Sequence, residues 1–210
     1  METITNEALL TIIQAIGKKI ESEKDYLTEL DNEIADGDHG INLSRGFQAV
    51  EEKLPSLSGK DISSILKTTG MQLVSKVGGA SGALYGTFFM KAGMAAKGLD
   101  VLDGQALVNI LQAGVDGVKS RGKATTGEKT MLDAWVPALD ALQAGVTAGK
   151  SLSDALADAV AAAAKGVEYT KTIVATKGRA SYIGERSLGH QDPGATSTLY
   201  MLEVLQQQVQ

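Results

Sequence analysis

Apolar residues recur at helical spacing in one segment of the chain after another, and this pattern constrains the fold more than any other feature. In the first such segment, residues 5–23, Leu9, Ile12, Ile16 and Ile20 lie three or four positions apart, which is the spacing of one face of an α-helix. No stretch of comparable length alternates apolar and polar residues as a half-buried β-strand does. The sequence therefore predicts an all-α fold.

The pattern divides the chain into eight helical segments. Asp61 precedes the third segment in the position of an N-cap, and Pro55 ends the second, as these residue types commonly do. The predicted helices cover residues 5–23, 41–54, 61–77, 83–97, 104–119, 130–144, 151–167 and 192–210. Since most connections are short, we expect a single domain, residues 1–210, built as an up-and-down antiparallel barrel or bundle of eight helices.

The connection over residues 175–191 is longer than the others. Long connections in compact domains are usually functional or disordered. This one contains Tyr182, Ile183 and Leu188 together with paired charges, so we expect it to be ordered and functional.

The stretch from Asp31 to Gly40 carries three aspartates, Asp31, Asp36 and Asp38. Carboxylates this close raise one another's pKa, so the cluster favours a bound cation, either Mg²⁺ with a phosphate partner or Ca²⁺. The spacing is not that of an EF-hand loop. On a regular helix Asp36 would point about 140° away from Asp31, so a turn at Gly37 is needed to gather the three. An acidic surface loop with an aspartate N-cap is the structural alternative.

Three glycine-containing loops, residues 37–40, 78–82 and 192–195, each lead into a predicted helix. Helix N-termini with free backbone amides bind anions. In an up-and-down bundle alternate connections lie at the same end. The three glycine-containing loops should therefore lie at the same end as the aspartates. The connections that carry the cations Lys123, Arg179 and Arg186 should lie there too. The sequence thus predicts a Mg–nucleotide site at one end of the bundle.

Composition excludes several classes of function. The net charge of −5 and the lack of a basic stripe argue against nucleic-acid binding. Cysteine is absent, which excludes a thiolate metal site and a cysteine nucleophile. The acidic N-terminus does not resemble a secretory signal, and no apolar run reaches the ~20 residues of a membrane span. We expect a cytoplasmic protein without a membrane partner. Residues 117–124 nearly match a Walker A motif, but Ala124 replaces the hydroxyl residue that would bind Mg²⁺.

The motifs together resemble one family. They are the D-x4-D-G-D-H-G stretch at residues 31–40, the glycine loop 78–82, the Arg-Gly-Lys at 121–123, the segment 177–186 and the segment 189–195. In this order, and over about residues 25–200, the chain resembles the nucleotide-binding L subunit of dihydroxyacetone kinases.

The resemblance implies a barrel of eight antiparallel helices with ADP or ATP bound at one end through two Mg²⁺ ions. It implies that Asp31, Asp36 and Asp38 hold the metals, and it implies no catalytic nucleophile. The residues implied to bind the nucleotide are His39, Gly40, Ile41, Asn42, Ala80, Ser81, Gly122, Met131, Arg179, Asp192, Pro193 and Gly194.

The resemblance also implies partner proteins. In the phosphoenolpyruvate-phosphotransferase-dependent type, a K subunit binds dihydroxyacetone and a phosphohistidine-carrying M subunit rephosphorylates ADP, which stays bound as a resident cofactor. Whether the chain forms a homodimer is open. The alternatives are the nucleotide domain of an ATP-dependent dihydroxyacetone kinase or fatty-acid kinase, and a regulatory module that reports its nucleotide state. A Ca²⁺-stabilised structural bundle is the remaining interpretation.

Overall fold

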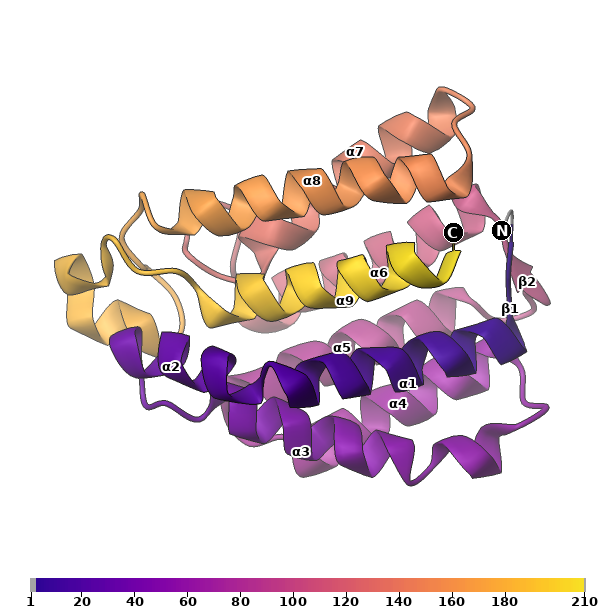
Figure 1. The fold of residues 1–210 in the computed structure, drawn as a ribbon, viewed down its shortest axis with the longest axis horizontal. Helices are drawn as coiled ribbons and strands as arrows, with labels where there is room; N and C mark the ends of the chain where they lie inside the picture. Colours follow the sequence, from indigo (N-terminus) through magenta and orange to yellow (C-terminus); the bar gives the residue numbers. More distant parts are fainter. Residues whose placement is uncertain (1–2, 210) are drawn as a thin grey trace.

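In the computed structural model of the protein, residues 3–209 are described, and their secondary structure is almost entirely helical (Figure 1). The described residues form nine α-helices: α1 (Asn6–Ser22), α2 (Lys24–Ile34), α3 (His39–Glu51), α4 (Ile62–Lys76), α5 (Gly79–Ala95), α6 (Gly104–Gly122), α7 (Leu132–Thr147), α8 (Leu152–Thr170) and α9 (Pro193–Val209). Two 3-10 segments, η1 (Leu54–Leu57) and η2 (Arg179–Ser187), lie in connections. The two-residue strands β1 (Ile4–Thr5) and β2 (Val101–Leu102) pair antiparallel, with Ile4 opposite Leu102.

Several helices begin at a residue whose side chain caps the first turn. Thr5, Asp61, Asp103 and Ser151 each accept a hydrogen bond from the backbone N–H three residues later, at 2.7 to 3.2 Å. A cap of this kind satisfies an N–H that has no partner within the helix. The helix starts predicted at Asp61 and Ser151 are therefore confirmed.

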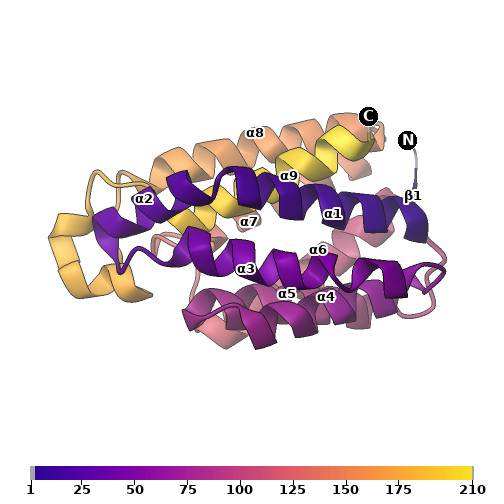
Figure 2. The same cartoon turned by 60° about the horizontal axis from the view of Figure 1, so that its bottom comes forward.

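Eight long helices form a closed ring. Each of α3 to α8 packs against the next helix along the chain, α1 packs against α3, and α9 returns to pack against α1. The helices run roughly along the long axis of the molecule in both views (Figures 1 and 2). Alternate connections consequently lie at the same end of the barrel, as the predicted up-and-down order requires.

The interior of the ring is one continuous apolar cluster built mainly from aliphatic residues. Its aromatic part includes Phe88, whose ring stacks on Trp135 with the centroids 4.5 Å apart. Helices α7 and α8 approach very closely at Gly166, where an added Cβ would lie 1.9 Å from the backbone oxygen of Asp133. This close contact fixes the end of α7 that leads to the site described below.

The structure corrects one part of the predicted helix pattern. The eight predicted helices correspond to α1 and α3 to α9, but residues 24–34 form an additional helix, α2. Leu27, Leu30 and Ile34 are buried at the spacing of a helix face, and this apolar face stabilises α2 against its neighbours. Asp31 therefore lies in the last turns of a helix and not in a loop. Among the described residues, none of the helices is both long and apolar enough to cross a membrane.

Candidate functional site

One end of the barrel carries a pocket to which four connections contribute. These are the connections between α2 and α3, α4 and α5, α6 and α7, and α8 and α9. In Figure 1, α2 and the connection that follows α8 mark this end, opposite the labelled chain termini. The N-terminal turns of α3, α5 and α9 face the pocket, so the positive ends of three helix dipoles point toward it.

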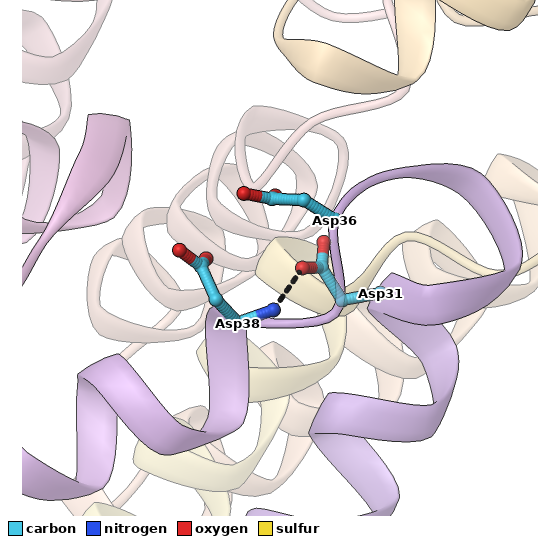
Figure 3. A group of neighbouring side chains, drawn as sticks. All are labelled: Asp31, Asp36 and Asp38. Carbon is cyan, nitrogen blue, oxygen red and sulfur yellow. Dashed lines mark hydrogen bonds between the residues drawn. The ribbon is translucent and has the colours of Figure 1, made fainter.

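The three aspartates are gathered by the turn between α2 and α3 (Figure 3). Gly37 adopts a left-handed backbone, φ 70°, which glycine accepts without strain. The reversal brings one carboxylate oxygen from each of Asp31, Asp36 and Asp38 within 4.8 Å of the others. Asp31 also accepts hydrogen bonds from the backbone N–H of Asp38, at 2.9 Å, and of His39, at 3.2 Å, and so caps the start of α3.

The environment of these carboxylates fits a divalent cation. Burial is the main cause that raises the pKa of Asp31; the neighbouring charges of Asp36 and Asp38 add to it, and the two backbone N–H groups oppose it. A cation at this place would offset both the desolvation and the repulsion. The cluster offers only oxygen ligands, the type that Mg²⁺ and Ca²⁺ prefer.

Three cationic residues line the pocket, Lys129, Lys177 and Arg179. Arg179, at the start of η2, pairs with Asp36 at 2.5 Å and is half exposed. Lys129 is only 1% exposed. Its ammonium donates to the backbone oxygens of Thr170, His190 and, at 3.3 Å, Ile173. Lys129 thus ties the α6–α7 connection to the end of α8 and to the connection that follows it.

Asp192 is a buried carboxylate at the start of α9. One of its oxygens accepts from the backbone N–H of Ala195 at 2.7 Å. Burial raises the pKa of Asp192 to about 7; Asp133 and Asp31 raise it further, whereas the hydrogen bond from Ala195 and the charge of Lys129 lower it. A carboxyl group with its pKa raised in this way favours a bound cation or a hydrogen-bond donor beside it.

His39, the first residue of α3, is buried between two hydroxyl groups. Its Nδ1 lies 3.0 Å from the Oγ of Ser81 on α5, and its Nε2 lies 2.9 Å from the Oγ of Ser197 on α9. Ser197 is also 2.7 Å from the hydroxyl of Tyr85. Burial lowers the pKa of His39 to about 4, so the imidazole is neutral at pH 7.

Most of the residues expected from the sequence line the pocket, namely Asp31, Asp36, Asp38, His39, Ala80, Ser81, Met131, Arg179, Asp192, Pro193 and Gly194. The other four, Gly40, Ile41, Asn42 and Gly122, are not among its lining residues. Gly40 packs against α2, where an added Cβ would be 2.1 Å from the backbone oxygen of Lys24. Ile41 is 49% exposed, Asn42 accepts a hydrogen bond from Arg45, and Gly122 ends α6. Of the three cations expected at this end, Arg179 lines the pocket, while Lys123 and Arg186 are not among its lining residues.

Sequence reasoning missed Lys129, Tyr85 and Ser197 as residues of the site. Lys129 was visible only as part of a loop that precedes a predicted helix. Tyr85 and Ser197 fall inside helical segments, where the apolar pattern carries no sign of a polar contact. Their partners come from elements far away in the sequence, so no local motif could have identified them.

Comparison with known proteins is consistent with this geometry. A family model described as the DAK2 domain matches residues 33–207. The chain is 47% identical over 203 residues to the PEP-dependent dihydroxyacetone kinase, ADP-binding subunit DhaL, of Escherichia coli, and the match covers 97% of both chains. It is 40% identical over 205 residues to the corresponding subunit of kinase 1 of Listeria innocua, with 98% of both chains covered.

A solved structure gives the same result for the fold. The dihydroxyacetone kinase from C. freundii in complex with AMP-PNP and Mg²⁺ superimposes with a TM-score of 0.74 at 26% identity, covering 94% of this chain and 33% of that one. The described helices thus match about a third of a longer kinase. The chain belongs to the DAK2 domain family and, within it, groups with the ADP-binding L subunits of dihydroxyacetone kinases.

Proposed function

We propose that the protein is the nucleotide-binding, phosphoryl-transferring subunit of a phosphoenolpyruvate-dependent dihydroxyacetone kinase. The observation that carries the proposal is the convergence of three carboxylates with the N-terminal turns of α3, α5 and α9 in one pocket. Carboxylates alone would hold a metal, and helix N-termini alone would hold an anion. Their combination suits a metal–phosphate ligand, and the similar subunits of E. coli and L. innocua are named as ADP-binding.

We propose that Asp31, Asp36 and Asp38 hold two Mg²⁺ ions. Mg²⁺ is usually bound by one or two carboxylates together with substrate phosphates, so three carboxylates offer more ligands than one such ion needs. When bound, Mg–ADP would supply the carrier of the phosphoryl group between a phosphohistidine donor and dihydroxyacetone, and the pocket residues would bind and orient that carrier. The ions would neutralise the charge that develops on the transferred group.

The residues of the chain bind and orient the phosphates, and none acts as a nucleophile. The amides at the start of α5, next to Ala80 and Ser81, face the pocket and supply donors for phosphate oxygens. Arg179 carries the one guanidinium among the pocket-lining residues and is held at the metal cluster by Asp36. Met131 and Leu84 line the pocket as apolar surface, which suits a base.

We propose two partners. A K subunit would present dihydroxyacetone, and an M subunit would present phosphohistidine. The reason for the second partner is that His39, the histidine that lines the pocket, is not free to carry a phosphoryl group, since both of its ring nitrogens already contact hydroxyls. A homodimer of this chain is a further arrangement that its mass in solution would test.

The deciding experiment measures what the purified protein retains. After exhaustive dialysis the protein is denatured, and the released nucleotide and magnesium are quantified. ADP close to stoichiometric with the chain, together with twice as much magnesium, is the expected result for a resident cofactor. An empty protein that binds ATP reversibly and uses it to phosphorylate dihydroxyacetone would favour the ATP-dependent alternative. Failure to bind any nucleotide in the presence of Mg²⁺ would refute the proposal.

A further inference from the structure

We propose that Tyr85 and Ser197 are positioning residues that set the tautomer of His39, so that the hydroxyl of Ser81 offers its proton to a phosphate oxygen in the pocket. Tyr85, Ser197, His39 and Ser81 form a continuous series of contacts, hereafter the hydroxyl–imidazole chain. Its contacts measure 2.7 Å, 2.9 Å and 3.0 Å in that order. The inference rests on the proposed function, since it requires an anion at Ser81.

The chain begins in the interior and ends in the pocket. Tyr85 and Ser197 are fully buried, and His39 is 6% exposed. Ser81 lines the pocket in the first turn of α5. Only Ser81 can therefore meet a ligand directly, and the other three act through it.

A neutral imidazole has one nitrogen that donates and one that accepts. If His39 carries its proton on Nδ1, it donates to the Oγ of Ser81, and the proton of the Ser81 hydroxyl is free to point into the pocket. If the proton is on Nε2, Nδ1 must accept from Ser81, and that hydroxyl can present only lone pairs to a ligand. The tautomer thus decides whether Ser81 attracts or repels a phosphate oxygen.

Ser197 selects between the two tautomers. Its single proton can go to the Nε2 of His39, to the hydroxyl of Tyr85, or to the backbone oxygens of Pro193, at 3.0 Å, and Gly194, at 3.2 Å. In the first case Nε2 accepts, and His39 is the Nδ1–H tautomer. We assign Tyr85 as the donor in its 2.7 Å contact with Ser197, and a hydroxyl that accepts one hydrogen bond becomes a stronger donor in the next. All donors then run in one direction, from Tyr85 to the pocket.

The arrangement also explains a polar group that the pocket alone does not require. The hydroxyl of Tyr85 contacts Ser197, the backbone oxygen of Gly194 at 3.1 Å and the hydroxyl of Thr198 at 3.3 Å, but Tyr85 itself does not line the pocket. A phenylalanine would fill the same apolar space. The hydroxyl–imidazole chain gives the buried Tyr85 hydroxyl a role in ligand recognition.

The test reads the tautomer directly. The chain has two histidines, so ¹⁵N-labelled imidazole spectra contain two ring systems, and a His190→Asn variant assigns them. We expect His39 to be the Nδ1–H tautomer in the Mg–ADP complex. In Ser197→Ala, Nε2 loses its hydroxyl donor. We expect the Nδ1–H tautomer to lose its preference, so that the Nε2–H form appears, and the ADP affinity to weaken on the order of tenfold, the loss typical of a hydrogen bond to a charged group.

Matched variants separate positioning from folding. Tyr85→Phe keeps the ring and should weaken ADP binding less than Ser197→Ala does. Thr198→Val removes a neighbouring buried hydroxyl that contacts Tyr85 but not His39, and it should leave tautomer and affinity as in the wild type. If Ser197→Ala fails to fold, Tyr85→Phe and the wild-type spectrum still test the proposal.

The outcomes distinguish this inference from the proposed function. Wild-type protein that binds Mg–ADP with His39 as the Nε2–H tautomer would overturn the inference alone. So would an unchanged tautomer and affinity in a folded Ser197→Ala variant. A wild-type chain that binds no ADP would overturn both.

Discussion

Replacing Lys129 by methionine should destabilise the fold strongly, although the substitution keeps most of the side chain's volume. The ammonium is buried and donates to three backbone oxygens, those of Thr170, Ile173 and His190. Methionine leaves these acceptors without a charged donor. Burial lowers the pKa of Lys129, while Asp192 and Asp133 raise it, so the ammonium is also the main positive charge beside two buried carboxylates.

The expected loss follows from these contacts. Breaking a buried charge interaction from one side typically costs about 3–5 kcal/mol. Methionine also removes the cost of burying an ammonium, which offsets part of the loss of three hydrogen bonds. We therefore expect a loss of about 3 kcal/mol, the lower end of that range. For a chain of this length each kcal/mol corresponds to a change in melting temperature of about 2–4 °C, which gives a decrease of roughly 10 °C.

The assay is thermal unfolding of the nucleotide-free protein at pH 7, followed by circular dichroism. Lys150→Met is the matched control, because Lys150 forms a surface pair with Asp158 and both side chains are about half exposed. Exposed pairs contribute about 0–1 kcal/mol, so the control should melt within a few degrees of the wild type. Equal melting temperatures for the two variants would refute the idea that Lys129 clamps the end of α8.

Three further predictions concern the acidic groups and the helix contacts. Burial raises the pKa of Asp192 from 3.8 to about 7, so between these pH values the folded chain without nucleotide binds a proton that the unfolded chain does not, and its stability falls as the pH rises. Asp192→Asn carries no charge at this position at any pH and should therefore match the wild type near pH 4. At pH 8 urea unfolding should show it more stable than the wild type by up to about 4 kcal/mol. The same advantage at both pH values would contradict this sign. Asp36→Ala should abolish retention of Mg–nucleotide while leaving the helical circular dichroism intact, and full binding by that variant would exclude the proposed metal site. Gly166→Ala should cost about 1–3 kcal/mol or more, because the new Cβ meets the backbone of α7, whereas Gly17→Ala, whose Cβ would make only ordinary contacts with Phe47, should be neutral or stabilising.

The ring of helices could be predicted because its signal is local and repeated. Each of the eight helices buries an apolar face whose spacing is visible in a single segment. The grouping of the site's loops at one end of the barrel was predicted from a single rule, that alternate connections of an up-and-down bundle lie at the same end. Helix α2 was not predicted, for a related reason. No glycine or proline separates Ser22 from Lys24, so the sequence does not mark where α1 ends. The cluster of aspartates then led to the prediction of a loop for the stretch that follows.

The contacts within the site could be predicted only in part. The turn at Gly37 was expected because three carboxylates cannot otherwise meet. The cap that Asp31 provides for α3 depends on the angle between α2 and α3, which no residue type in the sequence specifies. The partners of Lys129 lie 41 to 61 positions further along the chain, and the contact between His39 and Ser197 spans 158 positions. Such pairs arise from the closure of the ring.

The arrangement of the site is electrostatically unfavourable by itself. Asp31 and Asp192 are buried near one another and both have raised pKa values. Two of the three cations that line the pocket are already engaged, Lys129 with backbone oxygens and Arg179 with Asp36. Burial of apolar residues in the interior of the barrel offsets the electrostatic destabilisation that these carboxylates cause in the folded chain. A ligand that brings divalent cations to the carboxylates and phosphates to the helix N-termini removes both kinds of unfavourable charge at once. Because it binds only the folded chain, it must also raise the free energy of unfolding, by about 2.7 kcal/mol at a hundredfold excess over its dissociation constant. The pocket is therefore the region of the fold whose stability depends most on its ligand.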